Sequence, residues 1–472
     1  MKKKLLILAI IIAVVCLFVY FQQDDTEEQE TKIAASKQSL FVAEDGDDEN
    51  DGSIEEPFQS LEKASIEATP GTTVYIRGGT YYEPIKVNHS GTKADPIVFQ
   101  AYDGEDVVIS GEKMEDTEEE TALASIIDKS YITIKGLTFS DLSTELADET
   151  VMGIYVTGNS SHITIVDNTI RNIETLHDNG NGHGIAVYAT EATKEIIIKG
   201  NLVENLKLGA SEALVLNGNI DGFDISQNTV RNNDNIGIDM IGYEGTSEEN
   251  DFVRNGTVES NIVYNNSSYG NPAYGEEYSA GGIYIDGGRN ITVDHNTVHH
   301  NDLGIEATSE HHNKYAVNIE LTNNTVYENN YAGISIGGYD TDRGGTKNSL
   351  ISNNILYKND LKGLDGGQLM LQYDTSSNKI DKNILTTSDN SLFIVNYFTA
   401  NSNNTLSSNV YHQEEDKESI WIWKDEEYTS LSAFQTATDS DNNSLYVDPK
   451  FVDAENGDFT LRPESPLKEI NE

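Results

Sequence analysis

The dipeptide Gly-Ile recurs through the middle of the chain, and an Asn follows each copy. The copies are Gly153-Ile154, Gly184-Ile185, Gly237-Ile238, Gly282-Ile283, Gly304-Ile305 and Gly333-Ile334, and Ala213-Leu214 fills the one gap. The Asn series comprises Asn168, Asn201, Asn228, Asn261, Asn296, Asn324, Asn354, Asn383 and Asn409. Self-similarity at a spacing of about 21 to 35 residues indicates a solenoid, in which equivalent residues of successive coils stack above one another.

One coil is represented by residues 281 to 301. Apolar and polar residues alternate in three short segments of this coil: Ile283 to Ile285, Ile291 to Val293, and Thr297 to His299. Such alternation is typical of half-buried strands. Three strands per coil predict an all-β, triangular parallel β-helix. The recurring Asn fits an inward-facing turn position, where amides of successive coils form a hydrogen-bonded ladder.

The regular coils are expected over residues 131–411, with other regions on either side. Residues 1–22 contain an apolar run behind Lys2, Lys3 and Lys4 without a small-x-small cleavage site, which predicts an uncleaved signal-anchor in preference to a cleaved signal peptide. The protein would then be extracellular, either anchored to the cell membrane or secreted. Residues 23–39 are an acidic linker, 40–130 an N-terminal cap with a capping helix and the first coils, and 412–472 a C-terminal coil and cap.

Charge and cysteine content narrow the classes of partner. The chain has 79 acidic residues against 31 basic ones and a formal charge of −48, which argues against a nucleic-acid partner. The single cysteine rules out a disulfide within the chain, so packing alone must hold the fold. A capped solenoid needs no partner subunit, and we therefore expect a monomer.

Residues 57 to 87 (PFQSLEKASIEATPGTTVYIRGGTYYEPIKV) resemble the entry region of family 9 polysaccharide lyases. Together with the coils, this stretch is similar to the pectate-lyase-like superfamily of right-handed parallel β-helices. The resemblance implies a right-handed solenoid directed at a polysaccharide or oligosaccharide outside the cytoplasm. It does not select a reaction, because the superfamily holds lyases, glycoside hydrolases, epimerases and binding proteins.

Stacking the coils predicts which residues lie side by side on the outer face of the solenoid. If each Ile of a Gly-Ile pair points inward, the residue after it points outward, and so does the residue two further on. The first outward column is Tyr155, Ala186, Val215, Asp239, Tyr284, Glu306 and Ser335. The second is Thr157, Tyr188, Asn217, Ile241, Asp286, Thr308 and Gly337. Carboxylates therefore gather on three successive coils.

Asp286, Glu306 and Asp239 are the predicted catalytic residues. One strand spacing and two residues along the strand put the Cα atoms of Asp286 and Glu306 roughly 8 Å apart. Paired carboxylates at such a separation suit glycoside hydrolysis, and close like charges drive their pKa values apart. The alternative is a row of solvated acids on an acidic protein.

Long loops flank the same three coils, as expected around a binding site. They supply Tyr243, Tyr339, Arg343 and His311 as candidate substrate-binding residues, beside Tyr284, Glu212 and Asn217 on the outward face. A surface-loop role is the simpler expectation for His183, His311 and His312, which lack a zinc-binding spacing. No metal or other cofactor is predicted, although the carboxylates are donors that calcium accepts.

Three functions remain open. The favoured one is a glycoside hydrolase that uses the Asp and Glu pair. The second is a calcium-assisted, pectate-type polysaccharide lyase, against which the outward columns offer no Lys or Arg as a base. The third is a non-catalytic, cell-surface glycan-binding protein.

Overall fold

A computed structural model describes residues 38–114, 120–414 and 417–468. The predicted signal-anchor, nearly all of the linker and the last four residues lie outside these ranges. Within them, no helix is long and apolar enough to cross a membrane. The folded unit begins at Gln38, two residues before the predicted N-terminal cap of residues 40–130.

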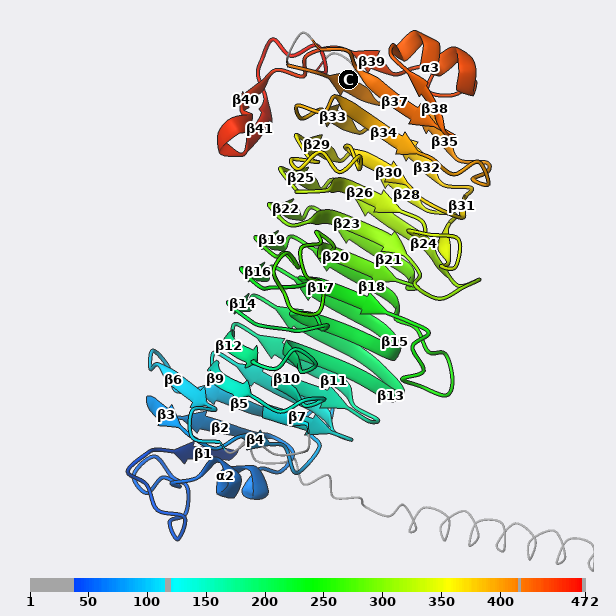
Figure 1. The fold of residues 1–472 in the computed structure, drawn as a ribbon. Coiled ribbons are helices and arrows are strands. Elements are labelled where there is room, and N and C mark those ends of the chain that lie inside the picture. The colour runs from blue at the N-terminus through cyan, green and yellow to red at the C-terminus, as the bar shows by residue number, and fades with distance from the viewer. Residues whose placement is uncertain (1–37, 115–119, 415–416, 469–472) are drawn as a thin grey trace, which may run out of the picture. The chain divides into compact units, whose positions relative to one another are not determined.

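The described residues form a right-handed parallel β-helix with three walls (Figure 1). The first wall holds β4 (Ile85–Lys86), β7 (Thr121–Ile127), β10 (Thr150–Thr157), β13 (Asn181–Lys199), β15 (Leu214–Ser226), β17 (Ile238–Ile241), β20 (Gly281–Asp286), β23 (Leu303–Thr308), β26 (Ala332–Ile336), β30 (Leu369–Leu371), β34 (Leu392–Asn396) and β37 (Ile420–Trp423). The second wall holds β1 (Gln38–Val42), β2 (Thr72–Ile76), β5 (Ile97–Ala101), β8 (Ser130–Lys135), β11 (Ser161–Val166), β18 (Arg254–Glu259), β21 (Arg289–Asp294), β24 (Tyr315–Thr322), β27 (Gly345–Lys347), β28 (Leu350–Ser352), β31 (Thr375–Ser376), β32 (Lys379–Asp381) and β35 (Thr405–Ser407), and β13 and β15 continue into it.

The third wall is a 13-stranded parallel sheet. Its strands are β3 (Gly79–Tyr81), β6 (Val107–Ser110), β9 (Thr138–Thr144), β12 (Thr169–Thr175), β14 (Leu202–Glu204), β16 (Thr229–Arg231), β19 (Ile262–Tyr264), β22 (Thr297–His299), β25 (Thr325–Tyr327), β29 (Ile355–Tyr357), β33 (Ile384–Thr386), β36 (Val410–His412) and β39 (Leu445–Tyr446). The sheets run without a break across residues 130 and 411, so the three predicted regions beyond the linker belong to one solenoid. The all-β parallel solenoid predicted from the repeat is confirmed.

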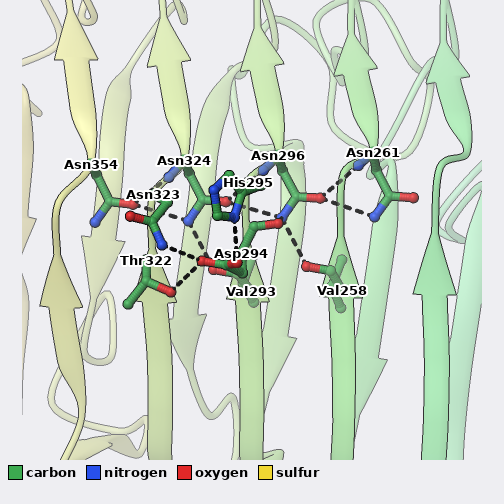
Figure 2. Close-up of polar contacts among 10 residues, drawn as sticks. All are labelled: Val258, Asn261, Val293, Asp294, His295, Asn296, Thr322, Asn323, Asn324 and Asn354. Atoms are coloured by element: carbon green, nitrogen blue, oxygen red, sulfur yellow. Dashed lines mark hydrogen bonds and ion pairs between the residues drawn. The ribbon is translucent and has the colours of Figure 1, made fainter.

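The Asn ladder lies inside the turn between the second and third walls, as predicted (Figure 2). Asn296 is typical: its Nδ2 donates to Oδ1 of Asn324 at 3.0 Å and to the carbonyl of Val258 at 2.9 Å. Its Oδ1 accepts from the backbone and side-chain nitrogens of Asn261. Each rung therefore satisfies buried backbone groups at a corner where the sheets cannot.

A second ladder, which the sequence analysis missed, occupies the turn between the third and first walls. Its members are Asn233, Asn266, Asn301, Asn329 and Asn359, and Gln368 ends it. Five of the rungs follow a member of the first ladder five residues later, as in Asn296 and Asn301. This pair of Asn residues five positions apart could have predicted the second ladder from the sequence.

The core is a continuous stack of Ile, Val and Leu from all three walls. The Gly of each Gly-Ile pair allows close packing at the corner into the first wall. A Cβ on Gly304 would lie 2.3 Å from Cγ1 of Val326 and 2.4 Å from the carbonyl oxygen of Gly333. No side chain fits there, which explains why the dipeptide recurs.

Both ends of the stack are covered. Helix α2 (Leu61–Glu67) lies at the N-terminal end beside β1 and β4, and Ser60 caps it through a bond from the Lys63 amide (Figure 1). At the other end stand α3 (Leu431–Thr438), β38 (Glu426–Tyr428), a hairpin of β40 (Phe451–Asp453) and β41 (Asp458–Leu461), and a 3-10 turn, η1 (Ala454–Asn456). Trp421 is fully buried there between Phe393 and Phe434.

Candidate functional site

The first outward column forms as the repeat predicts. On β17, β20 and β23 the isoleucines Ile238, Ile283 and Ile305 enter the core. The following residues pair directly across the strands, Asp239 with Tyr284 and Tyr284 with Glu306. The fixed alternation of strand side chains therefore brings distant acids to one wall.

Asp286 lies on the same face, two residues beyond Tyr284, and pairs with Thr308 of the next coil. It is thus the diagonal neighbour of Glu306, a relation that places the two Cα atoms about 8 Å apart. The three predicted catalytic residues therefore share one wall and one face.

The acids are buried, which excludes a row of solvated carboxylates. Asp239 is 2% exposed, Asp286 3% and Glu306 7%. Loops inserted after the strands cover them: the backbone amide of Glu310 donates to Oδ1 of Asp286 at 2.7 Å, and Tyr284 donates its hydroxyl hydrogen to Oε1 of Glu310 at 3.3 Å. Sequence periodicity located the strand face but gave no information about this cover.

The loop of residues 267–280 is fastened to the wall by Asp302. This carboxylate is fully buried and accepts the backbone amides of Ser268 and Ala280 at 2.8 and 3.1 Å. This loop carries Tyr274, whose pKa is raised by burial and then by the charges of Glu212 and Glu310. Asp302 thus anchors both ends of this loop to the first wall.

Burial and mutual repulsion shift the titration of these acids. Burial, followed by the charge of Glu310, raises the pKa of Glu306 to about 8. Burial, followed by the charge of Glu244, raises the pKa of Glu212 to about 8 as well. For Asp239 and Asp286, burial and neighbouring acids hold the pKa well above the ordinary aspartate value.

Glu310 and Glu244 are the acids that the sequence analysis did not select. Glu310 contributes to the raised pKa of Asp239, Asp286 and Glu306. The loop after β23 that carries Glu310 had been noted, but loop conformation is not set by a strand period. No sequence signal singles out Glu310, the one acid in residues 307–315, or Glu244 among the three acids of residues 242–250.

Glu212 and Asn217 lie beside the catalytic candidates. Asn217 is fully buried and donates to Oε2 of Glu244 at 2.9 Å. The backbone carbonyl of Glu212 is 2.9 Å from Nδ1 of His183, whose Nε2 lies 3.2 Å from the Tyr188 hydroxyl. The expected surface-loop role for His183 is wrong, because this ring is 1% exposed on β13. Its burial lowers its pKa to about 4, so the ring is neutral.

The two tyrosines predicted to bind substrate from the loops, Tyr243 and Tyr339, each contact a different arginine. Tyr339, 45% exposed, bonds with Arg343, whose Nη1 reaches the carbonyl oxygen of Glu310. Tyr243 instead accepts two bonds from Arg289. Both arginines contact tyrosine hydroxyls.

His311 lies against the acids and not on an isolated loop. One ligand atom each of His311, Asp286 and Glu244 lie within 4.8 Å of one another. His312, its neighbour, is exposed. The site thus combines a buried acid whose pKa is raised to about 8, further carboxyl groups and an imidazole, and this set is suited to proton transfer.

Comparisons with known proteins agree with this architecture. Residues 40–237 match the family described as "Pel9A-like, right handed beta helix region", and residues 210–341 and 281–422 match "Right handed beta helix region". The chain is 57% identical over 433 residues to "Uncharacterized protein YwoF" of Bacillus subtilis (strain 168), covering 92% of each. It is 44% identical over 80 residues to pectate lyase PEL9 of Emericella nidulans, 16% of this chain and 20% of that one.

The fold is shared with carbohydrate-active proteins. A GH136 lacto-N-biosidase from Eubacterium ramulus superposes with a TM-score of 0.52 at 15% identity, over 92% of this chain and 70% of that one. At that identity the likeness concerns the backbone. The chain belongs to the pectate-lyase-like superfamily of right-handed parallel β-helices, in one family with the YwoF protein.

Proposed function

We propose that this protein is an extracellular glycoside hydrolase that cleaves a polysaccharide or oligosaccharide. The observation that carries the proposal is Glu306, a buried carboxyl group whose pKa is raised to about 8. A general acid must hold its proton near neutral pH, and Glu306 does so while further acids stand on the same wall.

Asp286 and Asp239 are the candidate partners of Glu306. Asp286 is the diagonal neighbour, and Asp239 lies two coils away in the same column, about 9.6 Å between Cα atoms at a 4.8 Å strand spacing. Carboxyl groups about 6.5–9.5 Å apart suit inversion, and about 5 Å suits retention. Those two values join Cα atoms, and side chains that lean together or apart bring the carboxyl groups into either range, so both stereochemical outcomes stay open.

The test is product analysis on a panel of polysaccharides and oligosaccharides. Glu306→Gln keeps the size of the side chain and is expected to lower kcat about 10²- to 10⁴-fold, since it removes a general acid. Glu320→Gln, at an exposed position on β24, is the matched control and should leave the rate unchanged. Full turnover by the Glu306 variant would show that the proposal is wrong.

A polysaccharide lyase is the second candidate, favoured by the match of residues 40–237 to the Pel9A-like family. Tyr284, buried between Asp239 and Glu306, would then have to serve as the base, because neither outward column holds a Lys or Arg. A lyase leaves an unsaturated product that absorbs in the near ultraviolet. Hydrolysis leaves a new reducing end without that absorbance, and binding without either product would favour a glycan-binding protein.

The proposed location is the outer face of the cell membrane. It rests on the apolar run behind the N-terminal lysines, which lies outside the described residues. Protease treatment of intact cells should remove the folded unit, and fractionation should separate an anchored form from a secreted one. Protection from the protease would contradict the proposal.

A further inference from the structure

We propose that Glu244, Asp286 and His311 bind a divalent transition-metal cation of the Zn²⁺ or Mn²⁺ type. The three residues come from the loop after β17, the end of β20 and the loop after β23. Ligand-bearing atoms of all three lie within 4.8 Å of one another. Bonds of about 2.0–2.2 Å to a tetrahedral cation put ligand atoms roughly 3.4 Å apart, so small side-chain movements complete the site.

Two unpartnered polar atoms point to a missing ligand. Nε2 of His311 is buried and lacks a hydrogen-bond partner among the described residues. Oδ1 of Asp239 is also buried and unpartnered, in a residue that is only 2% exposed. Asp239 pairs across the strands with Tyr284, two residues before Asp286, so the side chains of Asp239 and Asp286 lie on the same face of the wall. Buried polar atoms without partners are rare, and a bound cation with its water accounts for both.

The balance of charge gives a separate reason. Six acids gather here: Glu212, Asp239, Glu244, Asp286, Glu306 and Glu310. Within the described residues, no Lys or Arg forms an ion pair with any of them. Asp239, Asp286 and Glu306 are buried, whereas Glu244 is exposed. Buried like charges are costly unless they are protonated or paired with a cation. A divalent ion would neutralise the two carboxylates that bind it.

The donor set selects the class of metal. Calcium and magnesium prefer shells made of oxygen, whereas imidazole suits zinc and other transition metals. Two carboxylates and one imidazole leave at least one position for water or a substrate oxygen. The site is therefore expected to prefer Zn²⁺ or Mn²⁺ over Ca²⁺.

Binding of the cation does not depend on the proposed hydrolase activity, but one consequence rests on it. With Asp286 bound to metal, Asp239 becomes the partner of Glu306 in the same column. The bound cation would lie between the catalytic carboxylates and the loops, where a hydroxyl or carboxylate of a glycan would reach its open position.

The experiment uses the full chain, stripped with EDTA and dialysed, and titrated separately with Zn²⁺, Mn²⁺ and Ca²⁺ by calorimetry. The expected result is about one equivalent of Zn²⁺ or Mn²⁺ with a Kd that His311→Ala weakens by at least about 10–100-fold. His312→Ala, at the exposed neighbouring position, is the control and should bind as the unaltered chain does. Circular dichroism verifies that each variant is folded.

Three results would overturn the inference: no stoichiometric binding, binding of Ca²⁺ alone, or equal affinities for the His311 and His312 variants. Each leaves the proposed hydrolase untouched, because glycan cleavage is measured separately. Conversely, metal binding that His311→Ala weakens, in a protein that cleaves no glycan, supports the cation site while the proposed hydrolase fails.

Discussion

Replacing Glu306 by Gln is expected to flatten the dependence of stability on pH. The carboxyl group titrates at about 8 in the folded protein, where burial and then the charge of Glu310 raise its pKa from the ordinary glutamate value of 4.5. The folded state therefore holds this proton more tightly than the unfolded chain. The associated stability is fully present below pH 4.5 and is lost as pH rises through about 8.

The size of the effect follows from the shift. Each pKa unit corresponds to about 1.36 kcal/mol, and a shift from 4.5 to about 8 gives a loss on the order of 5 kcal/mol between pH 4 and pH 9. Because Glu306 is only 7% exposed, water screens little of this loss. A Gln side chain does not ionise and retains an oxygen for Ser335 and Gln372.

The assay is urea unfolding at pH 5 and pH 9, in buffer with a chelator. Between these two pH values, the free energy of unfolding should fall by about 3–5 kcal/mol less for Glu306→Gln than for the unaltered chain. Glu320→Gln, exposed on β24, should follow the unaltered chain. Equal losses for the Glu306 variant and the unaltered chain would mean that this carboxyl ionises without penalty. The assignment of Glu306 as the protonated acid would then fail.

Two further predictions concern the scaffold and the cover of the site. Asn296→Ala removes the acceptor of the Asn261 amide and should lower the free energy of unfolding, measured in urea, by about 2–4 kcal/mol. The control Asn88→Ala, at an exposed position, should change this free energy by less than about 0.5 kcal/mol. Equal effects of the two substitutions would contradict a stabilising role of the Asn ladder. Asp302→Ala removes the acceptor of two backbone amides, so limited proteolysis should cut faster within residues 267–280 and KM should rise. An unchanged cutting pattern would refute the proposal that Asp302 anchors this loop.

Most of the fold was accessible from the sequence because a solenoid repeats one local rule. Side-chain alternation on each strand fixes which residues face the core, and the Gly-Ile period fixes which residues stack. Asp239, Tyr284 and Glu306 therefore pair as predicted. The same reasoning placed Asp286 correctly, since it depends only on strand position.

The loops were not accessible in this way. The positions of Glu244, Glu310 and His311 depend on turns whose length and hydrogen bonds have no period. Burial of the acids is a property of those loops, so the strand pattern alone did not exclude the alternative of solvated carboxylates. His183 was misread for a related reason: an isolated His on a strand carries no sign of the neighbours that bury it.

The two Asn ladders explain how the wall tolerates such a site. Their hydrogen bonds lie at the corners, and the Ile stack lies inside the coil, so neither depends on what the outward face of the first wall carries. In a solenoid each coil is stabilised chiefly by its immediate neighbours. The energetic penalty of buried acids therefore stays local, on the coils of β17, β20 and β23, while the rest of the stack remains stable. Sites of this kind trade stability for function, and hydrogen exchange should consequently be fastest in the strands that carry the acids, relative to equally buried strands nearer the ends.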